Sequence, residues 1–373
     1  MSEKQKLKEI ALLFFKLGSI AFGGPAAHIA MMEDEVVKKR KWMTQEHFLD
    51  LIGATNLIPG PNSTEMTMHC GHERAGWKGL FVAGCCFIFP AVVITGIFAW
   101  LYGQYGQLPE VEPFIVGIKP AVIAIIVMAA YRLGKKAIKS KPLAILGLLT
   151  IFACFLGLNE ITALFGCGAI GLIFYLIKKN RANLNSIVPL ILVQIMDPSK
   201  MGTFKIFLTF LKIGAILYGS GYVLFAFLDS ELVATGWLTR QELIDAVAVG
   251  QITPGPVLST ATFIGWQMGG IYGAIGATLG IFLPSFLLVL VLNPLIPKMR
   301  KSKLVGAVLD AVNVAAVALI VVVCIEMAKD TLTDWRTILL AIASLIVVFY
   351  FKKVKSAFSV LGGARLGYCL YLI

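Results

Sequence analysis

The sequence predicts an all-α polytopic membrane protein made of two inverted-topology repeats with broken and re-entrant helices. Three observations predict this fold: a strongly apolar composition, an ordered internal repeat, and proline–glycine interruptions at matching places in both halves. Of the 373 residues, 58% are hydrophobic and only 14% are charged. A soluble domain is nearer to half apolar and a quarter charged. Much of the surface should therefore face a lipid bilayer.

Apolar runs of about 20 residues, long enough to cross a bilayer, recur along the chain. They cover residues 80–102, 114–133, 143–177 (long enough for two crossings), 271–292 and 304–327. Short basic clusters lie between them, at 38–41, 135–141, 178–181, 298–303 and 352–355. Basic clusters of this kind are typical of cytoplasmic loops, so the net charge of +12 does not indicate nucleic-acid binding. We expect a multi-pass protein of the cytoplasmic membrane.

The cysteine and histidine patterns predict no metal site. The seven cysteines lie mostly within apolar runs without CxxC spacing, so we interpret them as small hydrophobic residues. His69, Cys70 and His72 lie close together, but no second cluster completes four-coordinate binding. We expect neither a metal nor a cofactor. The sequence contains no P-loop motif, so it does not indicate ATP-driven transport. The N-terminal apolar stretch resembles a signal peptide but recurs mid-chain, so we expect it to be retained.

The two halves of the chain repeat each other at an offset of about 195 residues, as between Pro59 and Pro254. The matching segments are 15–18 with 211–214, 22–25 with 218–221, 42–44 with 237–239, 59–61 with 254–256, and 89–90 with 283–284. Their constant order makes chance similarity a poor explanation. The repeat predicts a first domain over residues 1–180, a connecting segment over 181–204 and a second domain over 205–373.

Equivalent loops of the two halves have opposite charge character. The basic loop 38–41 corresponds to the uncharged segment 234–236, and the acidic loop 103–113 corresponds to the basic loop 293–303. Because basic loops stay in the cytoplasm, the two repeats should insert in opposite orientations, as in many secondary transporters. The alternative is a parallel duplication whose loops have drifted in charge.

The predicted orientation requires an odd number of crossings between residues 38–41 and 103–113. We therefore expect a re-entrant hairpin over residues 48–70, with Pro59-Gly60-Pro61 at its tip, followed by one crossing. The same arrangement should recur over residues 243–269, around Pro254-Gly255-Pro256. Proline breaks a helix and glycine lets the backbone turn. Residues 17–26 and 213–222 should form a second pair of helix breaks.

Interrupted helices offer a site for an anion, because their exposed N-terminal N–H groups attract negative charge. The two pairs of breaks should converge near the middle of the membrane; the alternative is that they only kink or pack helices. Lys16 and Lys212 share one repeat position within apolar segments, where a lysine usually faces a cavity or a partner unless it reaches the interface. The candidate substrate-binding residues are Lys16, Gly23, Gly24, Pro25, Pro59, Gly60, Pro61, Asn62, Ser63, Thr64, Glu65, Lys212, Gly219, Ser220, Gly221, Pro254, Gly255 and Pro256.

Other intramembrane polar residues have less certain roles. Asp50 and Asp245 are candidates for coupling transport to an ion, and Glu65 could either join them or cap the first turn of its helix. Lys119 is a third intramembrane cation, without a lysine counterpart in the second half. Small residues at four-residue spacing, such as Gly71, Ala75 and Gly79, predict close helix packing.

The chain resembles the chromate ion transporter family in its long, two-domain form. The resemblance rests on residues 22–25, 42–44, 59–65, 214, 218–221, 237–239 and 253–256, and it covers nearly the whole chain. It implies membrane-potential- or proton-coupled export of chromate, with sulfate as a similar tetrahedral oxyanion. The second Phe-Gly-Gly motif departs here to Tyr218-Gly219-Ser220, where the serine hydroxyl should alter a substrate contact.

The main prediction is a secondary transporter that works by alternating access, with one repeat rocking against the other. The alternatives are a passive oxyanion channel and a sulfate-type permease without chromate preference. An intramembrane enzyme would need a clustered catalytic constellation, which is not evident, so we expect no catalytic residues. The expected partners are a small oxyanion and the bilayer, with no nucleic acid; a homodimer is a candidate assembly.

Overall fold

The computed structural model describes residues 1–22, 24–106, 108, 111–179, 202–218, 221–292, 302–351 and 356–371. It is 87% helical and contains no strand in these residues. Five helices are long and apolar enough to cross a membrane: Asn62–Tyr105, Glu112–Ala137, Glu160–Ile177, Val257–Leu292 and Leu304–Thr331. They coincide with the predicted apolar runs, and the prediction of an all-α polytopic membrane protein is confirmed.

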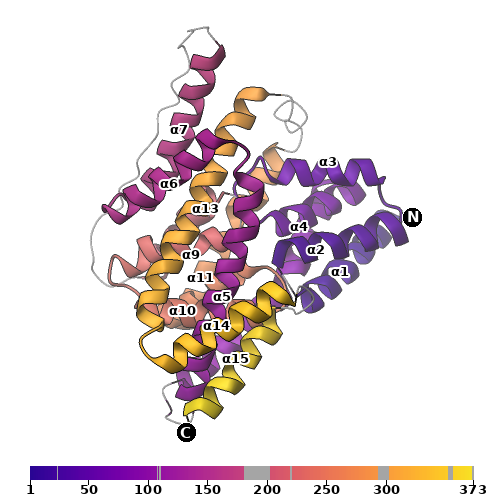
Figure 1. The fold of residues 1–373 in the computed structure, drawn as a ribbon. Coiled ribbons are helices and arrows are strands. Elements are labelled where there is room, and N and C mark those ends of the chain that lie inside the picture. Colours follow the sequence, from indigo (N-terminus) through magenta and orange to yellow (C-terminus); the bar gives the residue numbers. More distant parts are fainter. Residues whose placement is uncertain are drawn as a thin grey trace.

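The helices follow one another in a similar order in the two halves of the chain, with the additional short helices η2 and η4 in the second half (Figure 1). The first half contains α1 (Glu3–Ile20), α2 (Gly24–Glu33), η1 (Asp34–Lys39), α3 (Gln45–Thr55), α4 (Asn62–Tyr105), α5 (Glu112–Ala137), α6 (Lys141–Phe155) and α7 (Glu160–Lys179). The second half contains α8 (Thr203–Ile216), η2 (Gly221–Val223), α9 (Leu224–Leu228), η3 (Asp229–Val233), α10 (Arg240–Ile252), η4 (Val257–Ser259), α11 (Thr260–Leu292), α13 (Lys303–Thr331), α14 (Trp335–Tyr350) and α15 (Ser356–Tyr371).

The repeated threonines at 44 and 239 start equivalent helices. The Thr44 side chain accepts a hydrogen bond from the N–H of His47 at the start of α3. Thr239 does the same for Glu242 at the start of α10, and the Glu242 carboxylate caps the Thr239 N–H in return. Such caps satisfy N–H groups that have no partner within the helix. The two short helices that lead to the Pro-Gly-Pro segments therefore begin at defined, equivalent positions.

A sharp turn divides both α4 and α11 into two antiparallel arms. Ala75 and Gly76 have φ/ψ of −148°/28° and 61°/−153°, and Gly269 and Gly270 have −154°/23° and 59°/−148°. The positive φ of the second residue favours glycine at both turns. Each Pro-Gly-Pro segment is thus followed by a short arm, residues 62–74 or 257–268, before the chain reverses into a long apolar arm.

Glycines let helices of each half approach backbone to backbone. A Cβ added at Gly18 of α1 would overlap the carbonyl oxygen of Phe87 in α4, and one at Gly214 of α8 would overlap that of Ile281 in α11. Close approach through small residues is how helices pack in a membrane. The end of α1 and the end of α8 are consequently fixed against the long arms.

The last two helices of each half pack on the long helix of the other half. In Figure 1, α6 and α7 lie along α13, whereas α14 and α15 lie against α5. Glycines allow close contacts at both places: Gly117 of α5 meets Gly367 of α15, and Gly171 of α7 meets Ala311 of α13. The halves are therefore interlocked through exchanged helical hairpins, an arrangement that the sequence did not predict.

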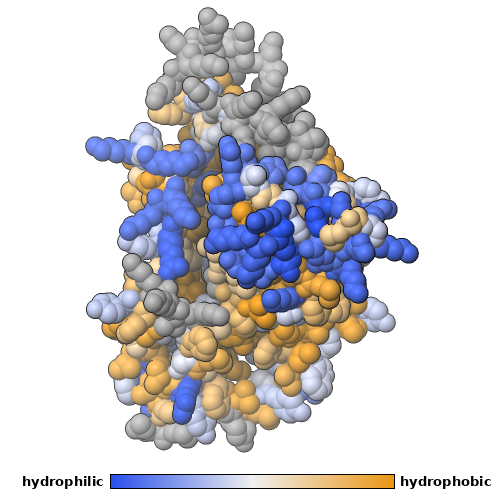
Figure 2. Space-filling view, turned by 90° about the vertical axis from the view of Figure 1, so that its right-hand side faces the viewer, coloured by the Kyte–Doolittle hydropathy of each residue, from blue (hydrophilic) through white to orange (hydrophobic). Residues whose placement is uncertain are grey.

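The side of the molecule formed by α1 to α4 combines a polar and an apolar zone. Figure 2 shows hydrophilic side chains gathered across the middle of this face and mostly hydrophobic side chains below them. Ion pairs connect α1 and α4, among them Lys78–Glu3 and Arg74–Glu9, with N···O distances of 2.8 and 2.9 Å. These pairs tie the start of α1 to α4 near the turn at Gly76.

Candidate functional site

The two Pro-Gly-Pro segments meet the two other helix breaks in a reciprocal arrangement. The N–H of Gly60 donates a hydrogen bond to the carbonyl oxygen of Leu217, just after α8, at 2.6 Å. The N–H of Gly255 donates to the carbonyl oxygen of Ala21, just after α1, at 2.9 Å. Each half therefore closes the break of the other half, and the structure brings all four interruptions together. We call the junction the region formed by Pro59-Gly60-Pro61, Pro254-Gly255-Pro256 and the chain just after α1 and just after α8.

The glycine of each Pro-Gly-Pro segment is required by its surroundings. Gly60 has φ of +141° and Gly255 has φ of +91°, a region that side chains disfavour. A Cβ at Gly60 would overlap Glu65 Oε1 and Ser285 Oγ, and a Cβ at Gly255 would lie 2.8 Å from the Cβ of Ala91. Both junction glycines thus contact the long arm of the opposite half.

Short helices begin at the junction directly after each Pro-Gly-Pro. Pro61 precedes the arm 62–74, and its carbonyl oxygen accepts the N–H groups of Thr64 and Glu65 at 2.8 and 3.1 Å. The first N–H groups of a helix have no partner within it, and the helix dipole adds partial positive charge. In the second half, η4 and α11 begin in the same way after Pro256. The arrangement can attract an anion from two directions.

Several buried polar side chains beside the junction have no hydrogen-bond partner in the described part of the chain. They are the hydroxyl of Thr64, both carboxylate oxygens of Glu65 and the hydroxyl of Ser285. Thr64, Glu65 and Ser285 are all fully buried. Because burying a polar group without a partner is costly, this cluster has unused capacity to bind a proton, an ion or a polar solute.

The structure places the remaining predicted residues around this centre or outside the description. Gly24 has φ of +78° at the start of α2 and lies beside the Tyr222 hydroxyl, and Pro25 follows it. Asn62 donates to Asn56 Oδ1 at 2.9 Å, which joins the two sides of the first Pro-Gly-Pro turn. Gly221 begins η2 and Ser63 is buried in the arm 62–74. Gly23, Gly219 and Ser220 lie outside the described residues.

Lys16 and Lys212 form equivalent ion pairs away from the Pro-Gly-Pro turns. Lys16 Nζ lies 3.7 Å from Glu35 Oε1 and its side chain is 60% exposed, so it is not enclosed as its apolar segment suggested. It borders a groove of about 420 Å³ that also contains Asp34 and Lys39, where the hydrogen bond from Lys39 lowers the pKa of Asp34. Lys212 Nζ lies 2.8 Å from Glu231 Oε1. Each of the two lysines therefore forms an ion pair with a carboxylate.

A buried charge pair connects helices of the two halves. Lys119 Nζ on α5 lies 3.3 Å from Asp245 Oδ1 on α10, and both side chains are less than a tenth exposed. The Tyr102 hydroxyl donates to Asp245 Oδ2 at 2.6 Å. The Lys119 charge noted in the sequence thus has a carboxylate partner from the other half. Asp50, the repeat counterpart of Asp245, lies half-buried on α3.

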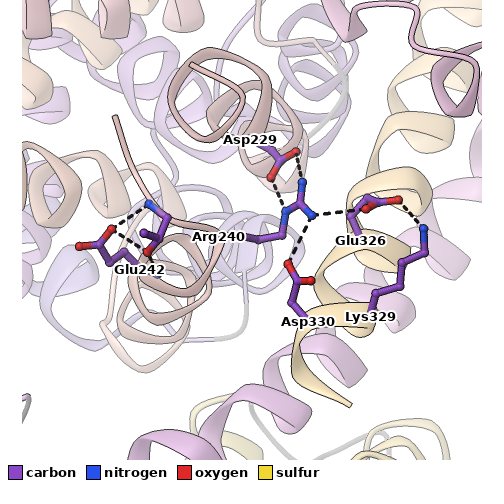
Figure 3. A network of polar contacts seen from close by, with 7 residues as sticks. Asp229, Arg240, Glu242, Glu326, Lys329 and Asp330 are labelled. Atoms are coloured by element: carbon purple, nitrogen blue, oxygen red, sulfur yellow. Dashed lines mark hydrogen bonds and ion pairs between the residues drawn. The ribbon is translucent and has the colours of Figure 1, made fainter. Parts of the chain in front are cut away.

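Arg240 fixes the start of α10, which sequence reasoning missed. Figure 3 shows its guanidinium between Asp229 of η3 and two carboxylates of α13. The distances are 3.0 Å to Asp229, 3.3 Å to Glu326 and 3.3 Å to Asp330. Charge-assisted hydrogen bonds of this kind fix direction as well as distance. The network holds α10, and with it Asp245, against α13.

His28 is a second residue that sequence reasoning missed, and it contacts the junction. Its Nε2 lies 3.1 Å from the carbonyl oxygen of Ala21, which also accepts the Gly255 N–H. The ring is buried and packs edge-on against Phe87. A histidine three residues after Gly24-Pro25, just beyond a predicted break, is the signal that could have identified it.

Comparisons with known proteins found a family model that matches the chain twice. A family model described as chromate transporter matches residues 8–172 and again residues 204–368. The chain is 31% identical over 353 residues to a probable chromate transport protein of Synechococcus elongatus, covering 91% of this chain and 89% of that protein. It is 29% identical to a chromate transport protein of Cupriavidus metallidurans over 98% and 93% of the two chains. A chromate transport protein of Pseudomonas aeruginosa is 28% identical over 85% and 80%. No solved structure matches.

Proposed function

We propose that this chain, which belongs to the chromate transporter family, is a secondary active transporter that exports chromate or a related tetrahedral oxyanion across the cytoplasmic membrane. Sulfate has the same shape and charge and is a second candidate substrate. The observation that carries the proposal is the junction, where Gly60 and Gly255 bond to breaks of the opposite half. Helix starts that meet inside a membrane protein are suited to hold an anion.

We place the substrate between the helix starts that follow the two Pro-Gly-Pro segments. The N–H groups at Asn62 and Ser63, the hydroxyl of Thr64 and the equivalent groups after Pro256 would contact the oxyanion. This region lies where the short arms of both halves meet the long arms of α4 and α11. Partial charges and hydroxyl groups would bind the anion with lower affinity than an unpaired cation would. Lower affinity suits a solute that must also be released.

The exchanged hairpins constrain how access can alternate. Movement of one half as a separate body would pull α6 and α7 away from α13, and α14 and α15 away from α5. We therefore assign the motion to α1–α4 and α8–α11 together, relative to α5–α7 and α13–α15. Lys119–Asp245 and Arg240–Glu326 cross this boundary, so they would change partners or distance during the cycle.

Opposite insertion of the two halves is part of the proposal. With each native cysteine replaced, a cysteine at Lys38 and one at Thr235, both exposed, should react with an impermeant thiol reagent from opposite sides of the membrane. The physical reason is that basic loops remain cytoplasmic, and residues 38–41 are basic whereas 234–236 are not. Labelling of both positions from the same side would contradict inversion and support a parallel duplication.

Lysine substitution tests whether the equivalent ion pairs serve transport. Lys16→Ala and Lys212→Ala should each lower oxyanion flux several-fold and leave membrane insertion intact, because each removes a cation near the end of a helix, α1 or α8, that leads into the junction. The double variant should lose more flux than either single variant. Lys78→Ala is a matched control, since Lys78 also pairs with a carboxylate of the same half, Glu3. Unchanged flux in the double variant would rule out a role for these lysines.

Flux measurements in sealed vesicles test the proposed function. Purified protein should exchange labelled chromate, and accumulate it when a membrane potential or a pH gradient is imposed. Liposomes without protein give the background, and sulfate as a competitor reports whether the two oxyanions share the site. A protein that exchanges no oxyanion would refute the proposal. Flux that only ever dissipates the anion's own gradient would favour the second candidate, a passive channel lined by the same broken helices.

A further inference from the structure

We propose that Glu65 is the residue that binds one proton with each transported oxyanion, so that an exported dianion moves with a net charge of −1 and an inside-negative membrane potential still drives it outward. This inference rests on the proposed function and deepens it by naming the coupling ion and its site. The proton would bind one carboxylate oxygen of Glu65 from one side of the membrane and leave it on the other. No other bond forms or breaks.

The position of Glu65 carries the first step of the argument. Glu65 lies in the first turn of the arm 62–74, directly after the first Pro-Gly-Pro. Its Oε1 is so close to Gly60 that a Cβ there would overlap it, and the same Cβ would also overlap Ser285 Oγ. The carboxyl group is therefore at the junction itself, in contact with the opposite half.

The surroundings of Glu65 carry the second step. Its side chain is fully buried, and neither carboxylate oxygen has a hydrogen-bond partner among the described residues. The hydroxyls of Thr64 and Ser285 beside it are also unpartnered. An ionised Glu65 carboxylate has no ion-pair partner among the residues that the structure describes, whereas the protonated form has no charge to compensate. A proton is the simplest ligand that satisfies this site.

Several other titratable groups on the elements around α4 have partners other than Glu65. Lys16 of α1 faces Glu35, His28 of α2 lies on the Ala21 carbonyl, Asp245 of α10 is held by Lys119 and Tyr102, and Glu73 at the far end of the arm pairs with His47 of α3. Asp50 of α3 is half-buried and has its own contact. His69, one turn after Glu65, likewise has a contact. The Tyr218 phenol is close enough to Glu65 to interact with it electrostatically. The described part of α11 contains no charged residue or histidine.

Binding of the anion and of the proton must favour each other. A dianion at the start of the arm 62–74 would be repelled by an ionised Glu65 in the same turn, and this repulsion is strong where water is excluded. The substrate should bind well only after Glu65 has taken up a proton. The repeat counterpart is Thr260, which cannot ionise. The junction is therefore asymmetric and carries one proton per cycle at this position.

Proton and oxyanion fluxes measured together test the proposal. Wild-type protein in liposomes, at a mildly alkaline pH where free chromate is fully deprotonated, should carry protons in the same direction as chromate, as reported by a trapped pH-sensitive dye. With the membrane potential clamped, one pH unit should change chromate accumulation about tenfold for one proton per anion. In Glu65→Gln, the chromate exchange that remains should carry no proton flux and should no longer respond to pH.

Two further variants control this experiment. Glu73→Gln makes the same chemical change on the same arm, at a carboxylate that pairs with His47 near the surface at 3.0 Å, and should leave proton coupling unchanged. Glu65→Asp keeps an ionisable group and should restore coupling at least in part. If Glu65→Gln does not fold, the paired fluxes of the wild type and of Glu65→Asp still decide whether protons accompany the anion and respond to this side chain.

Defined results would overturn the inference. The first is that the wild type exchanges chromate without any proton movement. The second is that Glu65→Gln keeps the wild-type proton-to-anion ratio. The third is that chromate accumulation follows a sodium gradient and does not respond to pH. In each of these cases chromate exchange persists, so the proposed function survives and only the coupling site is wrong. Absence of chromate exchange in the wild type at every pH would instead refute the proposed function and the inference with it.

Discussion

Replacement of Gly60 by alanine should abolish most transport. The residue has φ of +141°, and a Cβ there would overlap Glu65 Oε1 and Ser285 Oγ. Forcing a side chain into such a backbone region costs about 1–3 kcal/mol, and the overlap adds to that cost. Since about 1.4 kcal/mol corresponds to tenfold in rate, we expect chromate flux to fall at least tenfold, with a lower thermal unfolding midpoint in detergent.

A glycine in open space gives the control for this substitution. Gly103, near the end of the same helix α4, has no neighbouring atom where a Cβ would go and has no positive φ. Gly103→Ala should therefore keep wild-type flux and stability. Wild-type flux in Gly60→Ala would mean that the junction around Gly60 is not where transport occurs.

Removal of one partner from the Lys119–Asp245 pair should have the largest effect on stability. Both side chains are less than a tenth exposed, and breaking a buried ion pair typically costs about 3–5 kcal/mol because the other charge is left unpaired. Lys119→Met alone should thus lower the unfolding midpoint strongly. Lys119→Met combined with Asp245→Leu should recover much of the stability, because two apolar groups replace the two charges.

A more exposed ion pair, Lys139–Asp310, serves as the matched comparison. Lys139 Nζ and Asp310 Oδ1 are 2.6 Å apart, but the two side chains are 62% and 31% exposed. Exposed pairs contribute about 0–1 kcal/mol, so Lys139→Met should change the midpoint little. Equal destabilisation by Lys119→Met and Lys139→Met, or no recovery in the double variant, would contradict the assignment of a buried, coupled pair.

The interruptions of the fold could be predicted because their chemistry is local. Proline and glycine act on their own backbone, so Pro59-Gly60-Pro61 and Pro254-Gly255-Pro256 marked breaks without any knowledge of their neighbours. The turn at Gly76 was not predicted, because a lone glycine among small residues also fits helix packing. The expected packing does occur: Gly71 and Gly79 touch, but they lie on the two arms of one hairpin.

The pairing of distant charges could not be predicted from one sequence. Lys119 and Asp245 were both identified as intramembrane charges, yet nothing local shows that α5 lies beside α10. Lys16 was expected to face a cavity or a partner, and it does pair with Glu35, but its side chain is 60% exposed. His28 was missed because a lone histidine carries no motif. The connecting segment 181–204 falls mainly outside the described residues, so its boundaries stay a prediction.

The exchanged hairpins also affect how the chain is made. Helix α7 ends at Lys179, but its packing partner α13 begins only at Lys303, long after the ribosome has released the first hairpin into the bilayer. Until then, the faces of α6 and α7 that later cover α13 must be shielded by lipid or by an insertion factor. The first half therefore reaches its final tertiary structure only when synthesis of the second half is nearly complete.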